Sequence, residues 1–165
     1  MVVVMDKKKM MRKAEEKKLG RETLFTRHMS LSVPIRCSTL RRGDHVVIRG
    51  RPCKVVELTS SKPGKHGHAK INFIGIDLFT GKKIEHSCPS TANVEIPYVT
   101  RTEYTLVNIE DAFLSLMDTD GKTKEDLALP QNVLGKKIQM GFAEGKELTV
   151  VVLSSMGEEA CIECR

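Results

Sequence analysis

The chain has few aromatic residues and no long apolar run. It contains no tryptophan, two tyrosines and five phenylalanines among 165 residues, so side chains on which nucleic-acid bases stack are scarce. No apolar run approaches the roughly 20 residues that a membrane-spanning helix needs. Residues 1–5 are too few for the core of a signal peptide, and the lysines follow them instead of preceding them. We therefore expect a soluble, cytoplasmic protein without a membrane partner.

The cysteines also lack a regular framework. There are five, an odd number, which is typical of a reducing compartment. The one C-x-x-C motif, Cys161-Ile-Glu-Cys164, lies at the end of the chain, whereas a redox motif of this kind opens a helix after a strand. A structural zinc site needs four ligands, and no second C-x-x-C or His-x-x-x-His completes one. We expect no metal, and two ordinary thiols on a terminal strand or tail.

Charge is distributed unevenly along the chain. Residues 31–98 hold 11 basic and 5 acidic side chains, whereas residues 99–165 hold 7 and 12, and residues 1–30 hold 9 and 4. The sign changes near Pro97, which also interrupts the strand pattern. We predict a basic extension over 1–30 and two small domains over 31–98 and 99–165. A basic first domain favours an anionic partner, RNA before a membrane surface, although a merely solvated surface is the alternative.

The extension contains strong helix formers over residues 7–19, but its apolar residues do not form a wide stripe. We expect it to be mobile, either as a frayed helix or as a disordered segment.

The first domain has the pattern of a small β-barrel. Short runs of strand-forming residues alternate with Gly, Pro, Asn and Asp, and few helical signals appear. The predicted strands are 45–49, 53–59, 69–77, 83–87 and 93–97. The predicted core consists of aliphatic and aromatic side chains from these runs: Val46, Ile48, Val55, Leu58, Phe73, Ile76 and Leu78.

The second domain has the content of an OB-fold. Strands are predicted over 102–109, 113–117, 122–128, 147–153 and 160–163, with one helix over 132–144. In this helix Leu134, Ile138 and Phe142 share one face, Asn132 caps the start and Gly145 ends it. Because the domain is acidic and poor in aromatics, we expect it to dock on a basic protein surface or by shape, not to stack bases.

One acidic stretch of this domain resembles the start of a calcium loop. It reads Asp118-Thr-Asp-Gly121, but the glycine comes two positions early and no glutamate closes the loop. We predict an Asp-Gly hairpin turn instead.

A short polar segment between the second and third predicted strands stands out. Residues 60–71 read Ser-Ser-Lys-Pro-Gly-Lys-His-Gly-His-Ala-Lys-Ile, which predicts a hairpin loop. Pro63 and Gly64 suit a type II turn that leaves Lys65 exposed in solvent. The remaining loop residues, Lys62, His66, Gly67, His68 and Lys70, make a slim cationic finger. Such a finger can enter a narrow anionic space or an enzyme pocket, whereas an ordinary solvated tip is the plain alternative.

This loop resembles the hypusine loop of the eukaryotic translation initiation factor 5A family. Further landmarks of that family follow in the same order: Arg51-Pro-Cys-Lys54, Asp77-Leu-Phe-Thr-Gly-Lys82, Cys88-Pro-Ser-Thr91, Leu114-Ser-Leu-Met117, Glu125-Asp-Leu127 and Val152-Leu-Ser-Ser-Met156. The resemblance implies a mainly β protein, with an SH3-like barrel followed by an OB-fold with one helix. The family usually has threonine at the position of Pro63. Proline stiffens the approach to Lys65, so the departure bears on modification efficiency.

The resemblance begins near Cys37 and does not cover the extension, because the family's amino-terminal arm is typically acidic. Met29 followed by Ser-Leu-Ser is a plausible start. Two explanations remain open: a native basic arm that adds RNA affinity, or an extension absent from the working protein.

The resemblance further implies that Lys65 is a modified residue of a non-enzymatic translation factor. Deoxyhypusine synthase would transfer the aminobutyl group of spermidine to its amine, and deoxyhypusine hydroxylase would complete hypusine. No other cofactor is implied. The long side chain would act on the exit-site side of the ribosome, near rRNA, ribosomal proteins and the acceptor end of the peptidyl-tRNA. There it would promote elongation through sequences such as consecutive prolines, and termination.

The other loop residues would support these steps. Contact with tRNA or rRNA, or recognition by the synthase, is assigned to Lys62, Gly64, His66, Gly67, His68 and Lys70.

Two rival functions come from other classes. A metal enzyme would use His66 and His68 with His45 or His86, but no carboxylate in the loop could act as a general base. A general RNA-binding barrel would use the loop lysines as interchangeable charges. The Lys65→Arg variant separates this rival from the modification hypothesis, because arginine keeps the charge but cannot receive the aminobutyl group.

Overall fold

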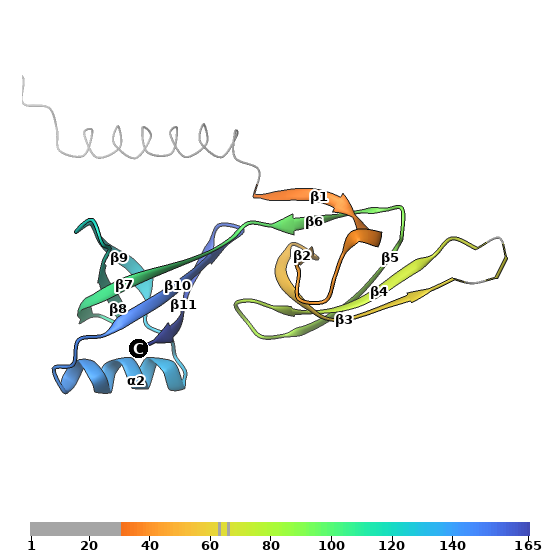
Figure 1. Cartoon of the computed structure of the whole chain (residues 1–165). Coiled ribbons are helices and arrows are strands. Elements are labelled where there is room, and N and C mark those ends of the chain that lie inside the picture. Colours follow the sequence, from red (N-terminus) through yellow and green to blue (C-terminus); the bar gives the residue numbers. More distant parts are fainter. Residues whose placement is uncertain (1–30, 63, 66) are drawn as a thin grey trace, which may run out of the picture. The chain divides into compact units, whose positions relative to one another are not determined.

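The computed structural model describes residues 31–62, 64, 65 and 67–165, of which Ser32–Arg165 form one compact unit. The predicted extension over 1–30 lies outside the described residues. The described chain is mainly β, with three antiparallel sheets that form two barrels and one α-helix (Figure 1). The predicted fold class is confirmed. No helix in the described part of the chain is long and apolar enough to cross a membrane.

The first barrel contains six antiparallel strands. Its main sheet has the order β2-β3-β4-β5, and β1 pairs with β6. The bounds are β1 Ser32–Arg36, β2 His45–Ile48, β3 Arg51–Ser61, β4 Lys70–Asp77, β5 Lys83–Pro89 and β6 Asn93–Pro97, with a short 3-10 helix η1 over Cys37–Thr39. Strand β6 also lies against β2 and so brings the two sheets together.

Strand β1 is absent from the sequence prediction. Pro34 occupies its centre, opposite Glu95 of β6. Proline lacks the N–H that a ladder uses and therefore weakens the local strand signal. Strand β1 has only one partner, so its other edge needs no donor at this position. The pairing with β6, which is distant in sequence, decides the conformation of these residues.

The core of the first barrel confirms most of the prediction and corrects it at two residues, Ile76 and Leu78. Val46, Ile48, Val55 and Phe73 are buried, and Leu58 packs against them. Ile76 was predicted as core but is 37% exposed, and Leu78 is only half-buried beyond the end of β4.

Strand alternation explains the error at Ile76. Side chains of a strand point to opposite faces in turn, so burial of Phe73 also turns Gly75 inward and Ile76 outward. Gly75 fits there because it lacks a side chain. An added Cβ would lie 2.6 Å from Ile48 Cδ1 and 2.8 Å from Cys53 Cβ.

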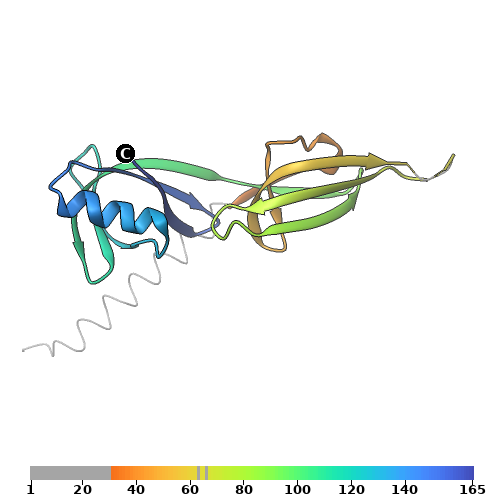
Figure 2. The ribbon, with the colours of Figure 1, turned by 90° about the horizontal axis from the view of Figure 1, so that it is seen from below.

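The second barrel is an OB-fold whose sheet has the order β11-β10-β7-β8-β9 (Figure 2). Its strands are β7 Val99–Glu110, β8 Phe113–Met117, β9 Thr123–Ala128, β10 Thr149–Ser155 and β11 Glu158–Cys164, and helix α2, Val133–Ala143, lies between β9 and β10 in the chain. All five predicted strands and the helix are present. The predicted Asp-Gly turn joins β8 to β9, where Asp118 Oδ1 accepts hydrogen bonds from the N–H groups of Asp120 and Lys122.

Helix α2, predicted over 132–144, spans Val133–Ala143, with the predicted Asn132 cap and the predicted stop at Gly145. The Asn132 side-chain oxygen accepts hydrogen bonds from the N–H groups of Leu134, at 2.9 Å, and Gly135, at 3.3 Å. At the other end Gly145 adopts φ +71°, and its N–H donates to the Phe142 carbonyl. Ile138 is fully buried, with Leu134 and Phe142 packed beside it. The apolar face therefore closes the second core.

Arg51 connects the two barrels. Its Nε and Nη2 donate to both carboxylate oxygens of the buried Asp77, at 2.7 and 3.1 Å, and its Nη1 donates to Glu158 of β11 at 2.7 Å. The guanidinium also lies 5.9 Å from the centre of the Phe79 ring. The Arg51 hydrogen bonds hold the pKa of the Asp77 carboxyl well below its usual range. Sequence reasoning treated Arg51 and Asp77 only as landmarks.

Candidate functional site

The candidate site is the turn of the hairpin formed by β3 and β4. The last paired residues are Ser61 and Lys70, so residues 62–69 connect the strands. Both views show this connection at the far end of the two strands, at the right (Figures 1 and 2). The predicted hairpin is confirmed. We call strands β3 and β4 with their connection the Lys65 arm.

The backbone of the turn needs a glycine at one described position. Gly64 adopts φ +68°, a conformation that side-chain-bearing residues rarely take. No atom lies within 4 Å of the place where a Cβ would stand. The space around Gly64 is thus open, and the positive φ is the reason for glycine. Pro63 and His66 lie outside the described residues, so the type II turn remains a prediction.

The described side chains of the turn face solvent. Lys62, Lys65, His68 and Lys70 are all exposed, and Gly67 is half-buried. Within the part of the chain that the structure describes, no carboxylate forms an ion pair with any of the three lysines. The structure therefore brings the predicted lysines together at one tip and leaves their amines available to an outside partner.

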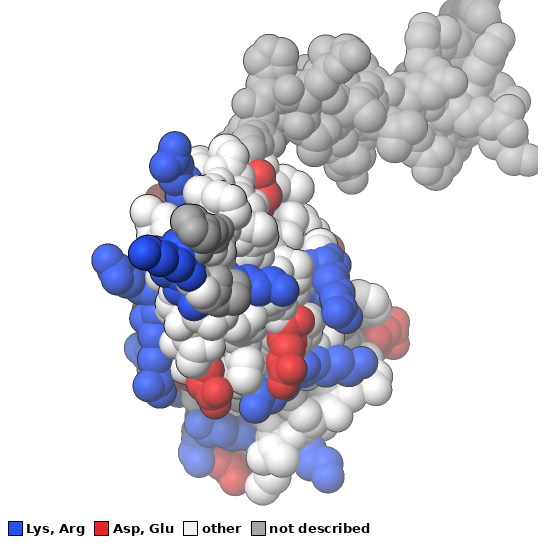
Figure 3. Space-filling model, turned by 90° about the vertical axis from the view of Figure 1, so that its right-hand side faces the viewer, with Lys and Arg blue, Asp and Glu red and all other residues white. Residues whose placement is uncertain are grey.

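The tip belongs to a basic surface. Figure 3 looks onto the end of the molecule from which the arm projects, and lysine and arginine side chains predominate there. This agrees with the 11 basic and 5 acidic residues of the first barrel. Summed positive charge attracts polyanions at a distance and raises their local concentration. The arrangement suits an anionic partner that meets the tip first.

The root of the arm is held firmly. Strand β4 lies between β3 and β5, and its first residue, Lys70, is opposite Pro89. Just beyond β5, the Ser90 N–H donates to the Ala69 carbonyl at 2.8 Å. The exit of the turn is thus tied to the segment that follows β5. A root paired in the sheet and a solvent-exposed tip allow the arm to present Lys65 to an outside partner.

The histidines invoked for a metal enzyme are placed differently from one another. His86 packs edge-to-face on Phe73, with ring centroids 5.5 Å apart. His45 lies on β2 opposite Lys54, and burial, followed by the charges of Lys54 and Arg101, lowers its pKa. The described residues contain no group of three or more potential metal ligands, and His66 lies outside them. The metal hypothesis gains no support from these positions.

The described aromatic side chains of the second barrel are few, and one of them, Phe113 on β8, is 47% exposed. Tyr104 packs against the core, and Lys124 is paired with Asp126 and Glu159 at 2.9 and 2.6 Å. Tyr98, in the connection between the barrels, is 59% exposed. Docking of this barrel on a basic protein surface remains a prediction.

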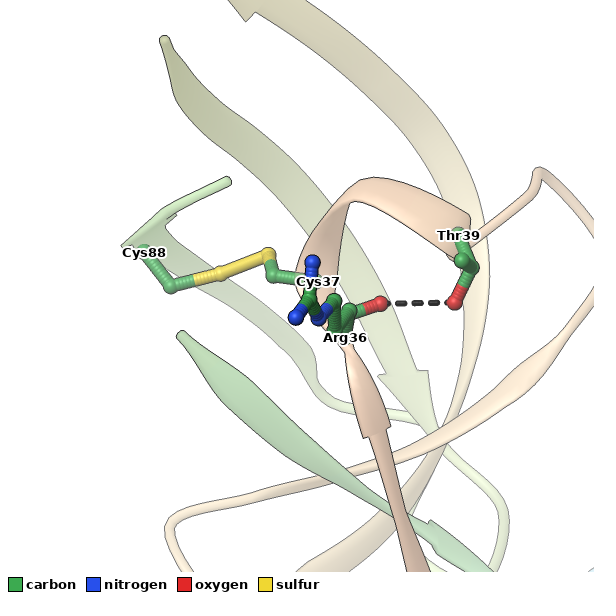
Figure 4. The surroundings of a disulfide bond; sticks show 4 residues. All are labelled: Arg36, Cys37, Thr39 and Cys88. Carbon is green, nitrogen blue, oxygen red and sulfur yellow. Dashed lines mark hydrogen bonds between the residues drawn. A yellow bond between two sulfur atoms is a disulfide. The ribbon is translucent and has the colours of Figure 1, made fainter. Parts of the chain in front are cut away.

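The cysteines differ from the sequence expectation at one pair. Cys161 and Cys164 are free and buried on β11, as predicted for ordinary thiols, and burial raises the pKa of Cys161 to about 11. Cys37 and Cys88, however, form a disulfide (Figure 4). The sequence carries no spacing signal for it, because 51 residues separate the two. Folding of the first barrel brings them together.

Comparison with protein families gives two matches that together span most of the chain. Residues 30–92 match a family model described as translation initiation factor 5A-like, N-terminal. Residues 98–165 match one described as eukaryotic elongation factor 5A hypusine, DNA-binding OB fold.

Individual proteins agree with these matches. The chain is 54% identical over 136 residues to eukaryotic translation initiation factor 5A-2 of Schizosaccharomyces pombe, covering 82% of this chain and 80% of the relative. It is 52% identical over 136 residues to the factor 5A of Dictyostelium discoideum, covering 82% and 86%.

Solved structures show the same similarity. A translation initiation factor 5A family protein from Naegleria fowleri superposes with a TM-score of 0.79 at 45% identity, covering 82% of this chain and 99% of that one. The eukaryotic translation initiation factor 5A from Methanococcus jannaschii gives 0.64 at 28% identity, covering 83% and 97%.

Proposed function

Because the chain belongs to the eukaryotic translation initiation factor 5A family, we propose that Lys65 is converted to hypusine and acts at the ribosome. The family is one of translation factors, not of enzymes, and a hypusine domain is named in its description. The observation that carries the proposal for this chain is the exposed Lys65 at the tip of a rigidly rooted arm.

Aminobutyl transfer requires a lysine whose side chain extends away from the surface of its own protein, so that it can enter the synthase pocket. Deoxyhypusine synthase would bind the arm, remove a proton from the Lys65 ammonium and transfer the aminobutyl group of spermidine to the amine. The bond from that group to the secondary nitrogen of spermidine breaks, and 1,3-diaminopropane leaves. A free lysine has a pKa of about 10.4, so the synthase pocket must favour the neutral amine. Gly64 and Gly67 add no bulk near the tip. Lys65 is the substrate of this reaction, and the hydroxylase completes hypusine.

The modified side chain is longer and carries two amines. It can place positive charge between phosphates at a depth that lysine does not reach. We place it near the acceptor end of the peptidyl-tRNA on the exit-site side of the ribosome. There it orients the substrates of peptide bond formation at difficult sequences such as consecutive prolines, and assists termination. This is catalysis by positioning, with the chemistry left to ribosomal RNA.

The other residues of the tip contribute charge and shape. Lys62 and Lys70 are exposed. We assign to them a contact with phosphate or a role in recognition by the synthase. The same role is assigned to Gly64, His66, Gly67 and His68. A single exposed charge contributes little to binding free energy, so substitution of any one of these residues should reduce activity less than substitution of Lys65.

A general RNA-binding barrel is the second candidate function, and the basic face around the arm favours it (Figure 3). In that function Lys65 is one charge among several. It predicts that Lys65→Arg retains nearly normal activity, because arginine also binds phosphate.

The first experiment is peptide mass spectrometry across residues 62–70 of protein from its own cell. We expect a mass increase confined to Lys65. A wholly unmodified Lys65 would exclude the mechanism even though the fold is that of the family.

The second experiment compares Lys65→Arg with Lys62→Arg, which removes a neighbouring exposed lysine in the same conservative way. We expect Lys65→Arg to lose translation of a reporter with consecutive prolines, and Lys62→Arg to retain it. Equal activity of the two variants would favour the general RNA-binding barrel.

A further inference from the structure

The disulfide between Cys37 and Cys88 lies at the root of the Lys65 arm. Cys37 opens η1, and Cys88 is opposite Ile71 in β4, one residue inside the first pair of that strand. Figure 4 shows the bond passing from η1 to the end of β5. The Cα atoms of the two cysteines are 6.8 Å apart.

Hydrogen bonds place the end of β5 and the residues just after it between η1 and the arm. The Cys37 N–H donates to the Ala92 carbonyl at 2.8 Å, and the Ser38 N–H donates to the Ser90 carbonyl at 3.1 Å. On its other side, the Ser90 N–H donates to the Ala69 carbonyl. Residues 88–92 therefore connect η1 to the exit of the turn that carries Lys65. We call residues 88–92 the root segment.

The remaining cysteines do not share this arrangement. Cys53 lies in the same core as Cys37 and Cys88 and is free, and Cys161 and Cys164 are free in the second core. Cys37 is fully buried, whereas Cys88 retains 6% of its surface and is followed by the exposed Pro89. A short opening of the root segment would expose Cys88 first.

We infer that Cys37 and Cys88 are a site of reversible oxidation, and that their disulfide stiffens the root of the arm. A disulfide of low molecular weight, such as glutathione disulfide, is the oxidant. The Cys88 thiolate attacks one of its sulfurs and releases one glutathione thiolate. The Cys37 thiolate then attacks the Cys88 sulfur of the mixed disulfide and releases the second. The two released thiolates take up the two cysteine protons, and excess glutathione reverses the reaction.

Oxidation adds a covalent bond to the root segment, and this bond should make the segment stiffer. In the reduced protein only hydrogen bonds and packing hold the root segment, and such contacts open locally without global unfolding. The covalent bond fixes one end of the segment to η1 and so suppresses these openings. Because the same segment binds the Ala69 carbonyl, the exit of the turn is restrained as well.

The test begins with the full chain in glutathione buffers of graded reduction, followed by alkylation, trypsin and mass spectrometry. We expect a cross-linked pair of peptides, 37–41 and 84–101, in oxidising buffer, and the separate alkylated peptides in reducing buffer. A bond that persists at every glutathione ratio is a permanent staple and overturns reversibility. A link that involves Cys53 instead overturns the assignment of the site.

Amide hydrogen exchange measures the stiffening. We expect exchange at residues 69–71 and 87–92 to slow by about tenfold on oxidation. The Cys37→Ala/Cys88→Ala double variant should show no difference between the buffers, whereas Cys53→Ala, which removes a buried thiol from the same core, should keep it. Equal exchange in both buffers for the unsubstituted chain overturns the inference.

The consequence for Lys65 rests on the proposed function. A stiffer root means that the arm loses less conformational entropy when it binds the synthase. The oxidised chain should therefore show a KM for aminobutyl transfer about threefold lower than that of the reduced chain, with kcat unchanged. An unchanged KM would refute this consequence. Failure of transfer in both buffers would instead count against the proposed function. Lys65→Arg, which cannot be modified, should retain the same difference in exchange, so the two failures are distinguishable.

Discussion

At the scale of the residue, Asp77 shows how position in the fold decides what a side chain does. It is 4% exposed, and its carboxylate binds the Arg51 guanidinium and the N–H groups of Phe79 and Thr80. A turn-forming aspartate before Phe-Thr-Gly is visible in the sequence. Its burial and its arginine, 26 residues earlier, are not.

Asp77 should make the free energy of unfolding depend on pH in the acid range. Its folded pKa lies below the unfolded value of about 3.9, so the stabilisation is fully present above about pH 4. It is lost as the pH falls through the folded pKa. Asp77→Asn should lower the free energy of unfolding by about 2 kcal/mol at neutral pH. It should also flatten the decline between about pH 4 and 2, as measured by urea unfolding.

Asp120→Asn, at an exposed turn position, is the matched control and should leave both quantities nearly unchanged. A decline for Asp77→Asn as steep as that of the unsubstituted chain would show that other carboxyls cause it.

At the scale of the element, sequence patterns predicted correctly those helices and strands whose conformation depends on residues close together in the chain. Helix α2 has its cap, its apolar face and its terminating glycine within one short segment, and the structure has all three in place. Strand β8 matches its predicted bounds, Phe113–Met117. Strand β1 was missed because Pro34 weakens its local signal and its pairing with β6 is distant. The prediction for Ile76 was wrong because side chains alternate along β4, so burial of Phe73 turns position 76 to the other face.

The contribution of the Asn132 cap of helix α2 to the stability of the protein can be measured separately. Asn132→Ala removes the acceptor of two N–H groups and should lower the free energy of unfolding by about 1 kcal/mol in urea titration. Asn132→Asp keeps an acceptor oxygen and should cost about 0.3 kcal/mol or less. Equal losses for the two variants would show that the cap is not the source of the effect.

At the scale of the whole molecule, the two barrels are joined through the Arg51 network. The guanidinium is anchored by Asp77 in the first barrel, and its remaining nitrogen reaches Glu158 in the second. Because Glu158 is 44% exposed, the pair contributes little to stability. Its value is geometric, since a bidentate anchor fixes the direction in which the third hydrogen bond points.

Loss of this contact should loosen the connection between the barrels without unfolding either. In Glu158→Gln we expect residual dipolar couplings of the two barrels to require separate alignment tensors, whereas one tensor should fit the unsubstituted chain. Glu159→Gln is the matched control, because Glu159 pairs with Lys124 inside the second barrel. A single tensor for Glu158→Gln would show that the connection between the barrels suffices to orient them.

The sequence by itself determined the mainly β class, the hairpin around Lys65 and the capped helix, because each depends on residues close together in the chain. Its order of landmarks also identified the family. Only the tertiary structure decided the pairing of β1 with β6, the disulfide between Cys37 and Cys88, and the contact of Arg51 with Asp77 and Glu158. Those partners are 26 to 107 residues apart, so the path of the folded chain brings them together and no local pattern encodes their contact.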